Sequence, residues 1–73
     1  MEQLMQILNS NFPHIDFEKE KNLMSDGILD SMAVVTLIAE IEAAFDVAVT
    51  MEYIQPSYFE SAETMWEMIE ELQ

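Results

Sequence analysis

The run 31–45 constrains the fold of this chain more than any other feature of the sequence. Its apolar residues recur at the three- and four-residue spacing of a helix with one buried face. These residues are Val34, Leu37, Ile38, Ile41 and Phe45. Asp30 and Ser31, directly before the stripe, are both residue types that favour a helix N-cap. We therefore expect an amphipathic helix that begins at about Ser31 and ends near Phe45, with Asp46 taking the left-handed conformation that stops it.

Similar spacing predicts two more helices and one short helical turn. The first helix covers about residues 2–11, because Pro13 pushes the residue before it away from helical angles. A last helix begins at about Ser61 and buries one stripe, which consists of Ala62, Met65, Ile69 and Leu72. Ser57 and Glu60 also have the spacing of a capping box, although Ser61 is the better start. Residues 51–54 can form one further turn before Pro56.

The stretch 14–29 has no helical period and reads as a long loop attached to the core by its apolar residues. Loops of this length in a compact domain are more often functional than filler. The expected fold is therefore all-α: a small four-helix bundle of three main helices and one short helix, with a long loop between helices one and two. With 73 residues, the chain has room for one domain, residues 1–73.

Composition excludes several functions. The chain has no cysteine, so it can form neither a disulfide nor a thiolate metal site. Its 73 residues are too few for a deep catalytic cleft, so we do not expect an enzyme. His14 has no nucleophile at a readable spacing, and the acidic residues of 16–20 do not follow a calcium-loop pattern. We therefore expect neither catalytic nor metal-ligating residues.

The charge limits the choice of partners. Asp and Glu number 15 against 2 lysines, which gives a net charge of −13. Nucleic acid is excluded because its binding needs Lys and Arg, and anionic membranes would repel the chain. A basic protein surface would attract it. No segment has the roughly 20 apolar residues of a membrane span, and the N-terminus lacks the basic region of a signal peptide. We expect a cytoplasmic monomer without membrane insertion.

Ser31 is the candidate for chemistry. A serine at the start of a helix places its hydroxyl near unpaired backbone N–H groups and the positive end of the helix dipole. An anion esterified to that hydroxyl, such as a phosphodiester, would be stabilised without any basic side chain. The alternative is an ordinary N-cap serine, and the pair Asp30-Ser31 taken alone favours that alternative.

The string Gly27-Ile28-Leu29-Asp30-Ser31-Met32 resembles the phosphopantetheine attachment site of acyl and peptidyl carrier proteins, in which the serine opens the second helix. Phe45-Asp46-Val47 is similar to the Phe-Gly-Val that closes this helix in the family, with Asp46 in place of glycine. Leu29 and Met32 around the pair, and Ile54, Pro56 and Phe59 further on, resemble D-alanyl carrier proteins more weakly.

The resemblance implies a carrier that is not itself a catalyst. Covalent 4′-phosphopantetheine would be attached to Ser31 by a phosphopantetheinyl transferase, with Asp30 helping to position the serine. An adenylating ligase or acyltransferase would load the thiol, and an acceptor synthase or transferase would unload it. The open face of the second helix would dock these enzymes, chiefly by apolar contact; it comprises Met32, Val35, Thr36, Ala39 and Glu42. So few acidic residues there point away from fatty acid synthesis and towards an aminoacyl or a specialised pathway. The rival hypothesis is a cofactor-free, acidic helical interaction module.

Overall fold

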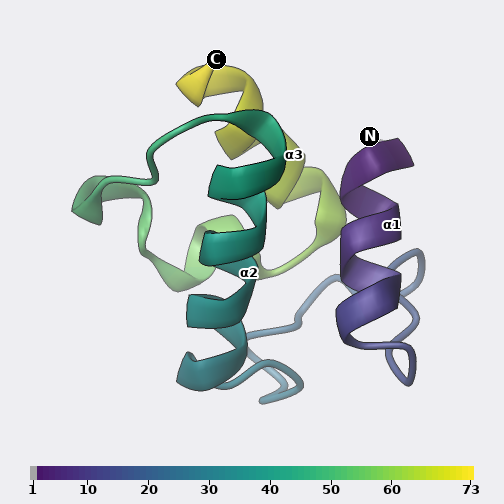
Figure 1. Ribbon diagram of the computed structural model, residues 1–73. Coiled ribbons are helices and arrows are strands. Elements are labelled where there is room, and N and C mark those ends of the chain that lie inside the picture. The colour runs from purple at the N-terminus through teal and green to yellow at the C-terminus, as the bar shows by residue number, and fades with distance from the viewer. Residues whose placement is uncertain (1) are drawn as a thin grey trace.

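The computed structural model describes residues 2–73, and Met1 lies outside this range. Within it the chain is helical and has no strand (Figure 1). Three α-helices and two short 3₁₀ helices follow one another: α1 (Glu2–Asn11), α2 (Ser31–Phe45), η1 (Met51–Tyr53), η2 (Pro56–Phe59) and α3 (Ala62–Leu72). The predicted bounds of the first two helices are confirmed, and the last helix begins directly after its expected cap, Ser61.

The predicted helix count differs from the structure. In place of one short helix between α2 and α3, the chain forms two separate 3₁₀ segments, η1 and η2. Pro56 is the physical reason. The residue before it, Gln55, is extended at φ −133° and ψ 146°, so no helix can run through this position. Pro56 itself begins η2, where its missing N–H costs no hydrogen bond.

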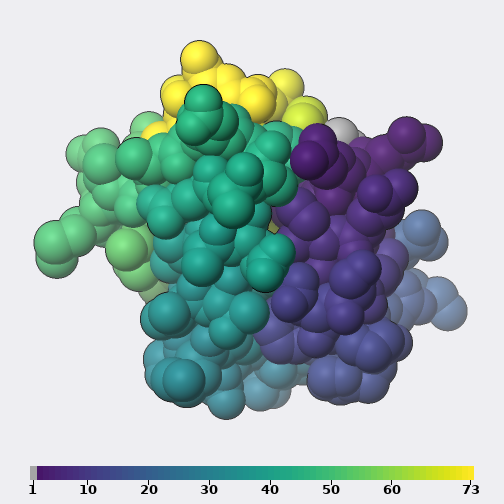
Figure 2. Space-filling view, viewed as in Figure 1, coloured from purple at the N-terminus to yellow at the C-terminus, as the bar shows by residue number. Residues whose placement is uncertain are grey.

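The three α-helices enclose one apolar core. α1 and α2 run antiparallel and side by side, with α3 behind them (Figure 1), and side chains of the first two helices meet along one face of the molecule (Figure 2). Each helix contributes buried side chains from one stripe, and these include Leu4, Leu8, Val34, Leu37, Ile41, Met65, Met68 and Ile69. The core thus combines side chains that lie far apart in the sequence, which fixes the position of α2 against the rest of the domain.

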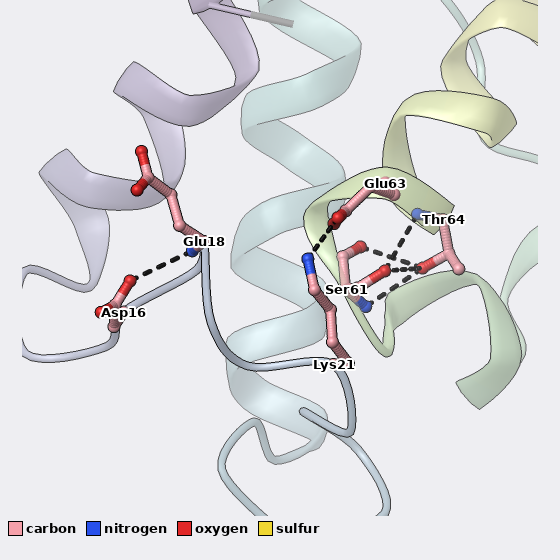
Figure 3. Close-up of polar contacts among 6 residues, drawn as sticks. All are labelled: Asp16, Glu18, Lys21, Ser61, Glu63 and Thr64. Carbon is pink, nitrogen blue, oxygen red and sulfur yellow. Dashed lines mark hydrogen bonds and ion pairs between the residues drawn. The ribbon is translucent and has the colours of Figure 1, made fainter.

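The long loop between α1 and α2 is attached to this core by four of its apolar side chains, whereas Ile28 is exposed. Ile15, Phe17, Leu23 and Leu29 are buried along it. Near its start, the Glu18 N–H donates to the side chain of Asp16 at 3.2 Å, which closes a local turn (Figure 3). The loop is therefore an ordered segment that leads from the end of α1 to the beginning of α2.

The ends of α2 and α3 are fixed by local chemistry. Asp46 ends α2 in the left-handed conformation, at φ 53° and ψ 51°, as predicted. Ser61 caps α3: its hydroxyl accepts from the Thr64 N–H at 3.2 Å, and Thr64 Oγ1 accepts from the Ser61 N–H at 3.1 Å (Figure 3). The capping box is therefore formed by this pair, and the alternative pairing of Ser57 with Glu60 is wrong.

No helix within residues 2–73 combines the length and the apolar character that crossing a bilayer requires. In the same range, no group of three or more histidine and carboxylate side chains is arranged to hold a metal ion.

Candidate functional site

The site is centred on Ser31, the first residue of α2, which is exposed. Asp30 is the N-cap residue, with extended backbone angles of φ −101° and ψ −178°. Its Oδ1 accepts from the Ala33 N–H at 2.8 Å, and its carbonyl oxygen accepts from the Val34 N–H at 3.0 Å. The sequence left the capping role open between Asp30 and Ser31. The structure gives it to Asp30, so the Ser31 hydroxyl is not used as the helix cap.

The backbone around Ser31 fits an esterified phosphate. An α-helix leaves its first N–H groups without intrahelical partners. In α2 the amide of Ala33 is bonded to the Asp30 side chain, whereas the amides of Ser31 and Met32 precede the first intrahelical bond. These two amides lie at the positive end of the helix dipole, beside the hydroxyl. A phosphodiester on Ser31 Oγ can therefore be held by backbone groups, although the chain has only 2 basic side chains.

A tight turn leads into the N-terminal end of α2. Gly27 has a φ of 69°, in the left-handed region that suits glycine. The Gly27 N–H donates to the Met24 carbonyl at 3.1 Å. The Leu23 carbonyl then accepts from the N–H groups of Ile28, at 2.9 Å, and Leu29, at 3.0 Å. Because Leu29 is also buried, the residues directly before Asp30 are fixed by both hydrogen bonds and packing.

Glu60, between η2 and α3, holds this turn from the other side. Its backbone carbonyl accepts from the Leu23 N–H at 2.9 Å. Its Oε1 accepts from the N–H groups of Met24, at 2.8 Å, and Ser25, at 3.0 Å, while Oε2 accepts from the Ser25 hydroxyl. The Ser25 hydroxyl chiefly, with the amides of Ser25 and Met24, lowers the pKa of the Glu60 carboxyl below its ordinary value, against partial desolvation. This contact could not be predicted from the sequence, because no local spacing connects Glu60 to residues 23–25.

A second tether joins the loop to the start of α3. The Lys21 ammonium forms an ion pair with Glu63 Oε2 (Figure 3). The hydrogen bond from Lys21 is the main cause of the lowered pKa of the Glu63 carboxyl. Both side chains are about half exposed, so the pair adds at most about 1 kcal/mol of stability.

An apolar groove opens beside Ser31 and has a cavity volume of about 270 Å³. It lies between α2 and the segment that contains η2, and Met24 of the long loop closes one side. Its lining also includes Val34, Val35, Ile38, Ile54, Pro56 and Phe59. Ser31 is therefore one of the residues that line an apolar groove, next to the point at which an attached group would begin.

The predicted docking face of α2 is mostly exposed. Met32 is 73% exposed and Val35 62%, and Thr36 and Ala39 are exposed as well. Two large apolar side chains in the segment after α2 are also exposed, Met51 (88%) and Ile54 (47%), and neither was predicted as part of this face. This segment stands out to the left of α2 in Figure 2. Exposed apolar side chains thus follow Ser31 on α2, and Ile54 lines the same groove as Ser31; the docking role of this surface stays a prediction.

Glu42 is the exception, and the prediction that it faces freely outward is wrong. The residue is half-buried, and its Oε2 accepts from the Val49 N–H at 2.9 Å. After the left-handed turn at Asp46, the chain folds back so that Val49 is buried. A backbone N–H in such a place needs a partner, and the Glu42 carboxylate supplies it. Glu42 therefore holds the connector after α2.

The chain was compared with protein families, curated proteins and solved structures. A family model described as the phosphopantetheine attachment site matches residues 2–56. The match covers α1, the long loop, α2 and η1, so it includes Ser31 and the whole turn before it. No curated protein and no solved structure matches significantly.

Proposed function

Because the chain belongs to the phosphopantetheine attachment-site family of acyl and peptidyl carrier proteins, we propose that it shuttles a thioester-linked acyl or aminoacyl group between enzymes. Members of this family carry 4′-phosphopantetheine covalently on a serine. We assign that serine to Ser31. The observation that carries the assignment is the exposed hydroxyl at the start of α2, with the capping role taken by Asp30.

The other serines are less suited to hold the group. Ser10 lies in the last turn of α1, where the helix dipole is negative. The Ser25 hydroxyl donates to the Glu60 carboxylate, and Ser61 is buried as the cap of α3. Ser57 lies in a 3₁₀ segment of four residues, which has little aligned dipole. Ser31 alone combines an exposed hydroxyl with the beginning of a long α-helix.

In the proposed attachment step, Ser31 Oγ bonds to the phosphorus at the phosphopantetheine end of the coenzyme A pyrophosphate link. That link breaks, adenosine 3′,5′-bisphosphate leaves, and the hydroxyl proton passes to a base on the transferase. The amides of Ser31 and Met32 would hold the phosphodiester charge. The attached group supplies a terminal thiol that holds the cargo as a thioester. The chain itself keeps the cargo at a high effective concentration for each docked enzyme.

The partners that we propose are a phosphopantetheinyl transferase, an adenylating ligase or acyltransferase, and an acceptor synthase or transferase. Met32, Val35, Thr36 and Ala39 would form their shared contact surface on α2. The net charge of −13 would steer basic partners towards it. With Glu42 turned to Val49, apolar contact dominates this surface, which supports an aminoacyl or D-alanyl-like cargo. A monomeric state and a cytoplasmic location stay predictions.

Intact-mass spectrometry tests whether phosphopantetheine is attached to the chain. The purified chain is incubated with coenzyme A and a promiscuous phosphopantetheinyl transferase. We expect one added phosphopantetheinyl group in the wild type and in Ser57→Ala, and none in Ser31→Ala. Absence of any mass shift in the wild type, with the transferase active on another carrier, would favour the rival hypothesis of a cofactor-free interaction module.

A further inference from the structure

We propose that Glu60 is a positioning residue, which fixes the turn 23–29 so that Ser31 and the residues before it are presented in one conformation to the enzyme that modifies Ser31. This inference rests on the function proposed above. Glu60 does not touch the site itself. It would act through the backbone of the loop, from a position 29 residues further along the chain.

The contacts form a continuous route from Glu60 to the site. The Glu60 carbonyl and carboxylate take up three successive amides of the loop, those of Leu23, Met24 and Ser25, at 2.8–3.0 Å. The Leu23 carbonyl in turn holds the amides of Ile28 and Leu29, at 2.9 and 3.0 Å. The next residue, Asp30, caps α2. Each link is a hydrogen bond of ordinary length. Freeing the Met24 and Ser25 amides from Glu60 would therefore loosen the turn that holds Ile28 and Leu29.

The hydrogen bonds to the loop distinguish Glu60 from the exposed acidic residues of the chain. Both of its carboxylate oxygens accept hydrogen bonds from the loop, and the residue is half-buried, unlike an acidic side chain that only adds surface charge. Its neighbours on either side are fixed, because Phe59 is buried in the core and Ser61 is the buried cap of α3. Because both neighbours are fixed, the position of Glu60 is fixed as well. Its hydrogen bonds can therefore hold the irregular loop in one conformation.

The same turn shapes the groove beside Ser31. Met24, whose amide is bonded to Glu60 Oε1, lines that groove together with Ser31 and Phe59. Loss of the Glu60 carboxylate would therefore free the amides of Met24 and Ser25, which loosens one wall of the groove and the turn that leads to Asp30, while the Leu23 amide keeps its bond to the Glu60 carbonyl. If the modifying enzyme binds only the ordered turn, its apparent affinity falls in proportion to the fraction of chains in which the turn is ordered.

The test compares four full-length variants with the wild type. Glu60→Ala removes the carboxylate contacts, and Glu60→Gln keeps an oxygen for the amides of Met24 and Ser25. Glu67→Ala removes one charge from an exposed position on α3. Ile69→Val removes one carbon atom from a buried core side chain and leaves every hydrogen bond of Glu60 in place. For each chain we would measure kcat and KM in the attachment of phosphopantetheine from coenzyme A, and hydrogen exchange at the Ile28 and Leu29 amides.

In Glu60→Ala we expect KM for the chain to rise about tenfold, if disorder of the turn leaves about one tenth of the molecules competent. The kcat should stay within about twofold, since Ser31 itself is unchanged. Exchange should speed up at Ile28 and Leu29 but not within α1. Glu60→Gln, Glu67→Ala and Ile69→Val should keep a KM close to that of the wild type.

Three results would overturn the positioning role. The first is an unchanged KM in Glu60→Ala while the wild type is modified normally. The second is an equal rise of KM in Ile69→Val, which would show that the rise comes from a lower overall stability of the fold. The third is a Glu60→Ala chain whose exchange increases equally everywhere. A wild-type chain that is never modified refutes the proposed function instead. If Glu60→Ala does not fold, Ser25→Ala replaces it: a KM and loop exchange like those of the wild type would then refute the role.

Discussion

Replacing Asp30 by alanine tests the local structure on which the site depends. The Asp30 carboxylate makes one cap hydrogen bond, to the Ala33 N–H at 2.8 Å. Loss of an N-cap side chain costs about 1 kcal/mol of the free energy of unfolding, within a range of about 0.5–2. For a domain of this size, about 1 kcal/mol corresponds to a fall in Tm of about 4–8 °C. We expect this shift for Asp30→Ala in thermal unfolding followed by circular dichroism.

Two control variants separate the cap from its neighbours. Asp30→Asn keeps the side-chain oxygen and caps about as well as aspartate, so its Tm should stay within about 2 °C of the wild type. Ser31→Ala should also leave the Tm nearly unchanged, because the structure gives Ser31 no capping role. If Ser31→Ala lowered the Tm as much as Asp30→Ala does, the serine hydroxyl would be the cap, and the reasoning that leaves it available for modification would be wrong.

Two further predictions concern acid and docking. The pKa of the Glu60 carboxyl is lower in the folded chain than in the unfolded chain, so the ionised carboxylate stabilises the fold at pH values above its unfolded pKa. This stabilisation is lost as the pH falls through the folded pKa, and the difference in Tm between the wild type and Glu60→Gln should therefore narrow from pH 6 to pH 3. A constant difference in Tm would contradict the conclusion that the hydrogen bonds to Ser25 and Met24 stabilise the ionised form of Glu60. Val35→Asp should leave the fold intact, since Val35 is 62% exposed, but should slow loading by the cognate ligase, whereas Asn9→Asp on α1 should not. Equal loading of both variants would exclude the apolar docking face.

Regular features of the structure followed from the sequence because they have local causes. The periodic apolar residues located α1 and α2, and Asp46 was identified as the left-handed residue that ends α2. Met65 was expected in the buried stripe of the last helix and is fully buried. Each of these depends on neighbours within one or two helical turns, which a reading of residue spacing can detect.

Features that depend on contacts between distant segments could not be predicted in this way. Glu60 reads as an ordinary acidic residue until the fold brings residues 23–25 against it. Glu42 reads as an exposed side chain on α2 until the connector returns and places the Val49 amide beside it. The choice between Asp30 and Ser31 as cap was also open, since both residue types are good caps and only backbone geometry decides.

Fragmentation mass spectrometry of the modified chain tests the central claim most directly. After treatment with coenzyme A and a promiscuous transferase, the chain is digested and the peptide that contains residues 27–32 is sequenced. We predict that the phosphopantetheinyl group is found on Ser31 and on no other residue. Its location on Ser25, Ser57 or any other side chain would contradict the account.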